Sequence, residues 1–438
     1  MTLHESSELQ ISDTVSLASK LIQFDTTNYG SGKAKGEQEI AAFVAQYLHN
    51  LGLHPQIIES SPRRANVIAR VPGKERDLDA LVVHGHLDVV PAVREQWSVD
   101  PFAGLVRDGM LWGRGAVDMK NMCAMILTSV AEILRSGGAP RRDLILAFFA
   151  DEEDGGEFGS GYMVQHHADL FAGASTAISE VGGYSIDLDG QRAYLIQTGE
   201  KAMEWIRLRA RGTAAHGSRV WHDNAVTKLA EAVAALGTHE WPVVLCDTTE
   251  QLLSKIAEIY GEDPKQVDPE TLLLRTGSAG GFISASLRTT TNPTALNAGY
   301  KHNVIPESAE ALIDIRCLPA DQETVLLIVQ EIVGEHIEIE VVHSDIGMEV
   351  PFAAEIVDQM TSSLHKYDPE ARVLPYLLSG GTDNKALSKI GITGYGFSPL
   401  QLPANFDFPG MFHGVDERVP VSAIDFGQKV LHDFLVNY

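Results

Sequence analysis

The sequence predicts an α/β protein with a mainly parallel sheet, into which a smaller α+β domain is inserted. Strand-like apolar runs alternate with amphipathic helices over the first 200 residues, which is typical of parallel sheets. The pattern changes near Lys201 to alternating half-buried strands, and it returns to helix and strand after residue 347. A chain of 438 residues is also too long for one compact core, so we expect two domains.

The elements of the first part follow from their apolar spacing. Helical spacing predicts amphipathic helices over 14–24, 37–51 and 120–135. Continuous apolar runs predict strands over 65–71, 79–90 and 143–153. In parallel sheets functional groups collect where strands end, so the residues after these runs are the first candidates for a site.

The middle part has a different order of elements. Strands are predicted over 203–212, 281–291, 310–318 and 336–345, and helices over 224–236 and 324–333. The order β-α-β-β-α-β matches a ferredoxin-like domain. An irregular insertion, 239–281, interrupts it and matches no motif. We therefore assign 1–200 and 348–438 to one domain and 201–347 to the inserted one.

Composition excludes several classes of function. The formal charge is −25 and basic clusters are absent, which argues against a nucleic-acid binder and against a polybasic membrane-surface protein. The three cysteines are far apart, so neither a disulfide framework nor a Cys-type zinc site is expected. The N-terminal stretch lacks the features of a signal peptide, and no apolar run is long enough to span a bilayer. We expect a cytoplasmic protein.

The stretch VVHGHLDVVP carries His84, His86 and Asp88 at alternate positions. Strand periodicity points the three side chains to one face, where they form a solvated edge, a satisfied core pair or part of a metal site. More acids and a histidine follow other apolar runs: Asp118, Glu152, Glu153, Glu180 and His413. Each alone is more often a solvated residue. Together, mixed imidazole and carboxylate groups suit Zn²⁺ or a similar ion, with one carboxylate left to move protons.

Six motifs then carry a family resemblance. They are HGHLDVVP, WGRGAVDMKN, FFADEED, SEVGG, GTAAHGS and HGVDERVPV. As a set, in this order and over essentially the whole chain, they resemble the M20 family of metallopeptidases. That family includes aminoacylase-1, acetylornithine and succinyl-diaminopimelate deacylases, and carboxypeptidases. The resemblance implies a zinc-peptidase catalytic domain, with residues 201–347 as a lid and dimerisation domain.

The resemblance implies a site with two divalent ions per subunit, Zn²⁺ first, with Co²⁺ and Mn²⁺ as alternatives. His86 and Glu180 resemble ligands of one ion, Glu153 and His413 resemble ligands of the other, and Asp118 resembles the bridging ligand.

Two further acids have roles in this resemblance. Glu152 resembles the general base, and Asp88 resembles the carboxylate that orients His86. His84 is then left as a buried, hydrogen-bonded residue. Its replacement by alanine is expected to retain metal, whereas His86→Ala is expected to lose it.

The lid also contributes residues. His216, preferred over His222 because it lies in GTAAHGS, resembles a histidine that polarises the scissile carbonyl, often in the partner subunit of a homodimer. Asn303 and Arg316 resemble residues that hold the carbonyl and carboxylate of the substrate. Gly381 and Thr382, in SGGTDN, resemble a loop that approaches the substrate.

The predicted function is dinuclear metal-dependent hydrolysis of an amide, which removes an acyl group or a C-terminal amino acid from N-acyl amino acids or small peptides. Glu180 in SEVGG favours a deacylase or carboxypeptidase, and EVGG most resembles the carboxypeptidase S-like branch. A dipeptidase or aminopeptidase is the alternative within the family. A catalytically silent binding protein is the alternative outside it, and the presence of Glu152 argues against that. A serine hydrolase and a thermolysin-like zinc site are disfavoured, because the chain contains neither GxSxG nor HExxH.

Overall fold

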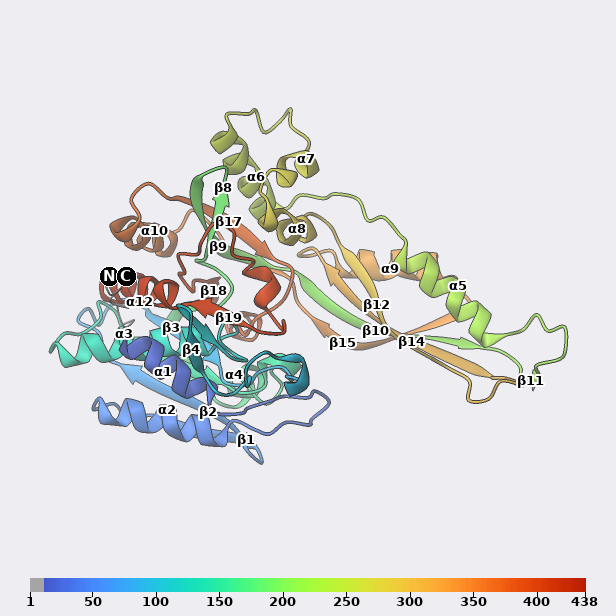
Figure 1. Ribbon diagram of the computed structural model, residues 1–438, viewed down its shortest axis with the longest axis horizontal. Coiled ribbons are helices and arrows are strands. Elements are labelled where there is room, and N and C mark those ends of the chain that lie inside the picture. Colours follow the sequence, from blue (N-terminus) through green and yellow to red (C-terminus); the bar gives the residue numbers. More distant parts are fainter. Residues whose placement is uncertain (1–11) are drawn as a thin grey trace, which may run out of the picture.

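The computed structural model describes residues 12–438, without the side chains of residues 278 and 279. A large body carries an elongated arm, which extends to the right in Figure 1. Three helices of the predicted insertion lie on the body at the top of the same view. No helix in the described part of the chain is both long and apolar enough to cross a membrane.

The body is built on one ten-stranded sheet. Its main path runs β1-β2-β6-β3-β7-β18-β9-β16, and β8 and β17 also pair with β9. The neighbours β6, β3, β7 and β18 pair in parallel, so the predicted mainly parallel sheet is confirmed. Its strands are β1 (Gln56–Ser61), β2 (Arg64–Val71), β3 (Ala80–His86), β6 (Leu144–Phe149), β7 (Ala174–Ser179), β8 (Ser185–Leu188), β9 (Gln191–Glu200), β16 (Met348–Glu349), β17 (Arg372–Leu378) and β18 (Thr393–Gly396).

Helices cover both faces of this sheet. Leu81 and Val83 of β3 belong to the larger core cluster, whereas Val82 between them faces the smaller cluster on the opposite side. This double burial explains why β3 reads as an unbroken apolar run. The larger cluster includes α1 (Asp13–Ile22), α2 (Gln38–Asn50), α3 (Lys120–Arg135), α10 (Glu355–Tyr367) and α12 (Val421–Asn437). The smaller cluster includes α4 (Ser160–His166) and α11 (Asn384–Ser388).

The arm has its own sheet and its own core. The sheet order is β12-β14-β10-β15 with every neighbouring pair antiparallel, as in a ferredoxin-like unit. A separate cluster of buried apolar residues joins it to the two helices. The elements are β10 (Ala202–Arg211), α5 (Ala225–Gly237), β12 (Thr290–Ala298), β14 (Ser308–Cys317), α9 (Gln322–Val333) and β15 (Ile337–Asp345), with β11 (Ala215–His216) and β13 (Val304–Ile305) at the far end.

The insertion is helical and packs on the body. It contains α6 (Asp247–Tyr260), α7 (Pro269–Leu274) and α8 (Ser278–Ser284), and α6 packs against β17. Its buried residues, such as Leu252 and Ile256, belong to the core of the body and not to that of the arm. The predicted domain boundaries include this segment in the inserted domain, because position along the chain does not show which core an insertion joins.

The strand predicted over 281–291 is wrong. Residues up to Ser284 belong to α8, a 3₁₀ turn follows, and β12 begins only at Thr290. Short apolar runs fit helix and strand equally well, so their periodicity does not decide. The observed strand β12 contains Pro293, a residue that is rare inside strands. It is tolerated because β12 is an edge strand, whose register shifts directly after Pro293.

Short elements complete the body. A three-stranded sheet joins β4 (Leu105–Arg107), β5 (Met110–Trp112) and β19 (Arg418–Pro420), and thereby brings the C-terminal part of the chain to residues near 110. The 3₁₀ helices are η1 (Arg94–Gln96), η2 (Glu152–Asp154), η3 (Ala168–Phe171), η4 (Ala285–Leu287) and η5 (Pro409–Met411).

Candidate metal centre and substrate cavity

The candidate site lies where three neighbouring parallel strands end. His86 is the last residue of β3, Glu180 directly follows β7, and Glu152 and Glu153 begin η2 shortly after β6. Because β3 lies between β6 and β7, with His86 level with Phe149 at the end of β6, these residues meet at one edge of the sheet. The strand stops at His86, so Asp88 lies beyond it and not on the continued strand face that its spacing suggested.

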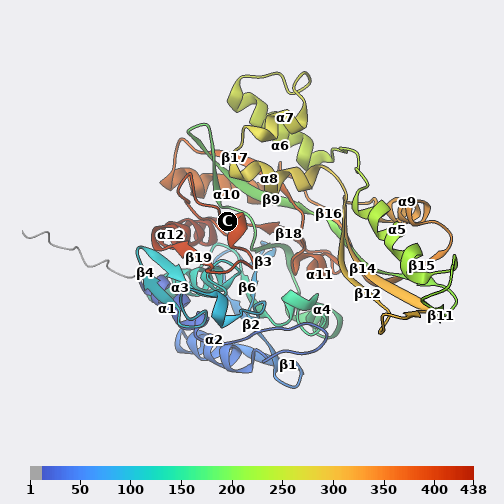
Figure 2. The same cartoon turned by 45° about the vertical axis from the view of Figure 1, so that its right-hand side comes forward.

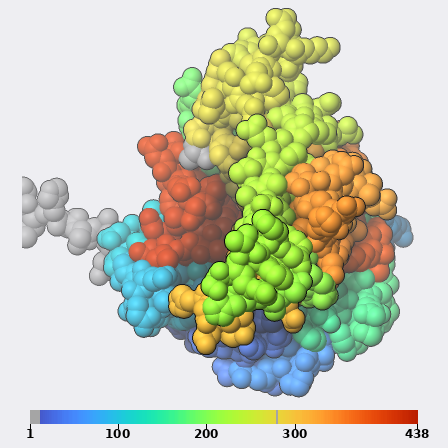
Figure 3. Space-filling model, turned by 90° about the vertical axis from the view of Figure 1, so that its right-hand side faces the viewer, coloured from blue at the N-terminus to red at the C-terminus, as the bar shows by residue number. Residues whose placement is uncertain are grey.

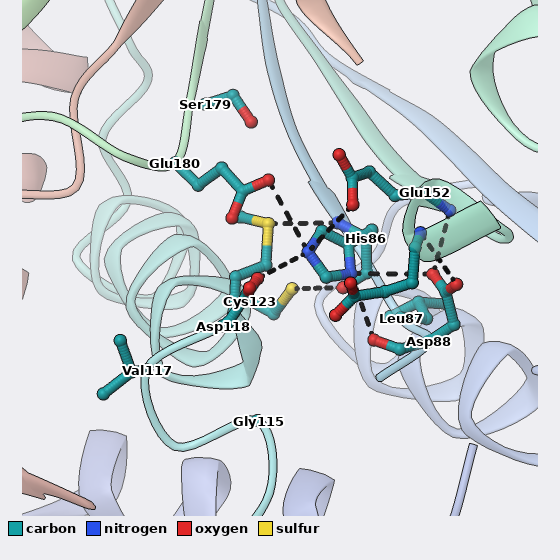
Figure 4. A network of polar contacts seen from close by, with 12 residues as sticks. His86, Leu87, Asp88, Gly115, Val117, Asp118, Cys123, Glu152, Ser179 and Glu180 are labelled. Atoms are coloured by element: carbon teal, nitrogen blue, oxygen red, sulfur yellow. Dashed lines mark hydrogen bonds and ion pairs between the residues drawn. The ribbon is translucent and has the colours of Figure 1, made fainter. Parts of the chain in front are cut away.

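The first ligand group surrounds His86 (Figure 4). Its Nε2 atom lies 2.9 Å from Asp118 Oδ1 and 3.6 Å from Glu180 Oε1. Donor atoms of His86, Asp118 and Glu180 all lie within 4.8 Å of one another, and the three residues are buried. This spacing would allow the three to hold one metal ion.

The second ligand group shares Asp118. His413 Nε2 lies 3.3 Å from Asp118 Oδ2 and 3.2 Å from Glu153 Oε2. Asp118 thus turns one oxygen toward each group. The structure therefore brings together all five residues predicted as metal ligands, with Asp118 between the two groups.

Asp88 lies behind the first group and makes more contacts than the sequence suggested. The backbone carbonyl of Asp88 is 3.0 Å from His86 Nδ1, and its carboxylate Oδ1 is 3.5 Å from the same nitrogen. The carboxylate accepts hydrogen bonds from the backbone N–H groups of Glu152 and Glu153. Asp88 therefore fixes the start of η2 as well as the imidazole of His86.

Burial makes the acids of the cluster costly to ionise. It raises the pKa of Glu180 to about 8 and that of Glu153 to about 7, and it raises the pKa of Glu152 well above its ordinary value. Burial acts in the same direction on Asp118, but hydrogen bonds with His413 and His86 outweigh it and hold the pKa of this carboxyl low. The contacts with Asp118 and Glu153 raise the pKa of His413 to about 10.

The cluster fits divalent cations. Glu153 Oε1 is buried and has no hydrogen-bond partner among the described residues, so it is free to accept a cation. A positive ion would also offset the crowded carboxyl groups, whose ionised forms are disfavoured by burial. Imidazole with carboxylate is a donor set that Zn²⁺ and related ions accept.

Two residues that sequence reasoning passed over tie the ligand loops together. Glu417 accepts hydrogen bonds from the backbone N–H groups of Gly115, Val117 and Asp118. Arg114 forms an ion pair with Glu417 at 2.7 Å and donates to the carbonyl of His413. Arg114 lies in the motif WGRGAVDMKN and Glu417 in HGVDERVPV, but the motifs alone did not indicate a role for either residue.

A second supporting network includes Asn28, Glu37 and Arg64, which lie outside the six motifs. Asn28 donates from its amide to Asp88 Oδ2 at 2.9 Å and to Asp151 Oδ1 at 3.0 Å. Arg64 also binds Asp151 and forms an ion pair with the buried Glu37. The network links Asp151, directly before η2, to Asp88 behind His86, and its five residues come from different parts of the chain.

A cavity of about 490 Å³ opens at the two ligand groups. Arg316, Gly381 and Thr382 line it, so these predicted substrate residues lie in the same space as the metal ligands. The guanidinium of Arg316 binds both oxygens of Asp314, at 2.7 and 2.9 Å. Thr382 donates from its backbone and hydroxyl to the buried carboxylate of Glu200.

Two predicted residues do not reach this cavity. His216 and Asn303 lie together at the far end of the arm, where β11 pairs with β13 and both side chains are exposed. His216 Nδ1 contacts Ser218 Oγ at 2.8 Å. Neither residue lines the cavity of its own chain.

His84 precedes His86 by two residues on the same face of β3 and is fully buried. Its Nε2 atom is 2.9 Å from Asn384 Oδ1, and burial lowers the pKa of its imidazole to about 4. It belongs to neither ligand group.

The model of the peptidase family M20/M25/M40 matches residues 82–437. The chain belongs to this family. This M20 protein is 27% identical to the N-fatty-acyl-amino acid synthase/hydrolase PM20D1 of Bos taurus, over 95% of the chain and 86% of that protein. It is 26% identical to aminoacylase-1B of Rattus norvegicus, over 86% of the chain and 84% of that protein. M20 membership and these relatives identify a metal-dependent hydrolase of amide or peptide bonds.

Solved M20 structures share its fold. The metallo-carboxypeptidase Sso-CP2 of Sulfolobus solfataricus superposes with a TM-score of 0.75 at 18% identity, and covers 97% of this chain and 99% of its own. The dipeptidase Dug1p of Saccharomyces cerevisiae superposes with a TM-score of 0.71 at 16% identity, and covers 96% and 95%. The predicted fold class is thus confirmed.

Proposed function

We propose that this M20 protein hydrolyses the amide bond of N-acyl amino acids or small peptides, releasing the acyl group or the C-terminal amino acid, with two metal ions in the site. The observation that carries the proposal is Asp118, whose two oxygens face two separate ligand groups. The relatives named as an N-fatty-acyl-amino acid hydrolase and an aminoacylase support an acylated amino acid as the substrate.

In this proposal His86, Glu180 and Asp118 hold one ion, and Asp118, Glu153 and His413 hold the other. Zn²⁺ is the first choice, and Co²⁺ and Mn²⁺ are alternatives for the same donors. When bound, such ions supply Lewis acidity, which polarises the scissile carbonyl and acidifies an attacking water.

Glu152 is the proposed general base. Its Oε2 atom lies 3.9 Å from His86 Nε2, at the edge of the first ligand group, and its backbone is fixed by Asp88. Burial raises its pKa well above the ordinary value, which suits a carboxyl group that takes a proton from water and returns it to the leaving nitrogen. Asp88 keeps the imidazole of His86 oriented.

Arg316 is proposed to hold the carboxylate of the substrate, since a guanidinium can bond both oxygens at once. In the present structure Asp314 occupies that position. Gly381 and Thr382, which line the same cavity, would then contact the substrate as well.

His216 and Asn303 are proposed to act in the site of a second subunit. Both are exposed at the far end of the arm, next to the exposed Val220 and Tyr300. A homodimer formed through the arms would let His216 donate a hydrogen bond to the oxyanion that develops on the scissile carbonyl.

The test is a screen of N-acyl amino acids and dipeptides with protein loaded with zinc, cobalt or manganese. We expect release of amino acid from the acylated substrates. Hydrolysis of dipeptides alone would assign the protein to the dipeptidase branch instead. Glu152→Gln is expected to bind metal and to lose activity by about 10²–10⁴-fold; full activity with metal bound would contradict the mechanism.

A further inference from the structure

The helical insertion reaches the active-site cavity through one side chain, Phe282 of α8. The ring of Phe282 lines the cavity that contains the two ligand groups. It also lines a second cavity, of about 430 Å³, on its other side. In Figures 1 and 2, α8 lies below α6 and α7 on the body, close to where the arm begins.

Other aromatic rings pack against Phe282 or line one of the two cavities. Phe282 stacks on the fully buried Tyr376, with ring centroids 5.3 Å apart. Phe412 lines the active-site cavity and Phe408 lines the second one, and their rings meet edge to face at 5.2 Å. Tyr184 packs against Phe408 from the second cavity at 4.8 Å.

The active-site cavity has a mainly apolar lining, whereas the lining of the second cavity mixes apolar and polar side chains. In the active-site cavity the apolar residues include Met203 and Leu378. In the second cavity they include Leu402 and Phe406, whereas charged residues such as Arg192 and Arg275 also line that cavity. Apolar walls accept an apolar part of a ligand, and the apolar side chains of both cavities offer such a surface on either side of the residue that they share, Phe282.

We propose that Phe282 ends the part of the active-site cavity that receives an unbranched apolar chain of the substrate, and that the size of this side chain limits the length of the chain. The inference rests on the proposed function, because it concerns the same cavity. The chain belongs either to the acyl group or to the side chain of the amino acid. A longer chain meets the ring, and a smaller residue at position 282 would let the chain continue into the second cavity.

The experiment compares kcat/KM over two substrate series for the metal-loaded wild type, Phe282→Ala, Phe282→Leu and Phe282→Trp. One series lengthens the acyl group on a fixed amino acid, and the other lengthens an unbranched side chain on N-acetyl amino acids. We expect Phe282→Ala and Phe282→Leu to move the optimum of one series to longer chains. For the first chain lengths beyond the wild-type limit, kcat/KM of these variants should exceed that of the wild type by about tenfold or more. Phe282→Trp is expected to move the optimum to shorter chains.

A second substitution tests whether the chain enters the second cavity. Ile186, which is half-buried, lines only that cavity of the two. Ile186→Trp in the Phe282→Ala background is expected to remove the gain for long chains, and Leu274→Ala, at an exposed site on α7, is expected to leave the profile of the wild type. Identical profiles for the wild type and all Phe282 variants in both series would overturn the inference.

Binding of straight-chain carboxylic acids gives a readout that needs no turnover. Calorimetric titration of the metal-loaded wild type and Phe282→Leu is expected to show a longer limiting chain for the variant. If the wild type hydrolyses no N-acyl amino acid, the proposed function fails, yet this titration still decides the role of Phe282: an unchanged limiting length overturns it.

Discussion

The two carboxylate oxygens of Asp118 face different ligand groups. The neighbouring histidines of β3 also differ, because His86 belongs to a ligand group and His84 is a buried core residue. His86 faces Asp118 and Glu180, whereas His84 faces Asn384 in the interior. The two histidines share one face of β3, so their different environments come only from where the strand ends. This difference gives matched pairs of variants at nearly the same place.

His84→Ala is expected to retain metal and much of the activity, because its contacts are to Asn384 and to core residues. His86→Ala is expected to lose metal and activity together. Metal content by mass spectrometry, measured on both variants after dialysis, checks this. Loss of metal from His84→Ala in a folded protein would show that His84 supports the centre directly.

His84 also predicts a pH dependence of stability. Burial lowers the pKa of its imidazole to about 4 in the folded protein, while an unfolded chain binds the proton near pH 6.5. Between these values the unfolded state binds more protons than the folded state. His84 therefore lowers the free energy of unfolding as the pH falls from about 6.5 to about 4. Urea unfolding of the wild type and His84→Gln across this range measures it. The variant is expected to show the smaller loss, and equal losses would refute the assignment.

At the scale of elements, the ligand loops depend on contacts made far from the metal ions. Glu417 and Arg114 connect the loop of Asp118 to the loop of His413, and Asp88 connects His86 to η2. Partners of this kind orient the ligands and so affect metal affinity without touching the metal.

Glu417→Gln is therefore expected to weaken metal binding by about 10–100-fold, because the amide places an NH₂ donor where Oε2 accepts from Arg114 and Gly115, and because it no longer forms the ion pair with Arg114. Competition with a chelator measures the affinity. Glu132→Gln, an exposed acid on α3, is the control and should bind metal like the wild type. Equal affinities for the two variants would mean that the loops hold their positions without Glu417.

The insertion is expected to stabilise the body. Leu252 of α6 is fully buried in the core of the body, so Leu252→Ala should lower its free energy of unfolding by about 2–5 kcal/mol. Leu274→Ala, at an exposed position on α7, should change it by less than about 0.5 kcal/mol. Denaturant unfolding of both variants decides. An unaffected Leu252→Ala protein would mean that the insertion folds apart from the body.

Predictions from the sequence were correct where they rested on local apolar spacing or on the six motifs taken together. The helix over 120–135 matches α3, and the five ligand residues meet in space. The strand over 281–291 failed because a short apolar run does not distinguish helix from strand. Glu417 was one acid among 59 Asp and Glu residues, and its role follows only from the three backbone groups that it meets.

At the scale of the molecule, the junction of the arm is held by buried lysines. Lys201, between β9 and β10, donates from Nζ to the carbonyls of Ala285 and Arg288, just after α8. Lys385 donates to the carbonyl of Lys201. Figure 3 shows the arm in front of the body, with the insertion above it in yellow. Hydrogen bonds with residues after α8 and with Lys385 of the body therefore fix the position of Lys201, at which the arm begins.

Mixing two inactive variants tests whether the arm serves a second subunit. Glu152→Gln retains His216, and His216→Ala retains Glu152. If His216 acts in the partner's site, a mixed dimer contains one complete site, and random mixing should restore about a quarter of the wild-type activity. If His216 acts within its own chain, no mixture contains a complete site. Activity measured after co-refolding or co-expression separates the two, and an unrestored mixture would contradict the proposed exchange.

The hydrogen bond between Val117 and Glu417 spans 300 residues of sequence. A ribosome therefore releases His86, Asp118 and Glu180 long before it makes the residues that fix the loop of Asp118 and supply His413. The nascent body can pair β3 with β6 and β7 early, but β17, β18 and the second ligand group exist only when the chain is nearly complete. In a dinuclear centre, filling of the second position would thus have to follow the synthesis of His413, because a shorter chain has an acidic cluster that lacks its last imidazole.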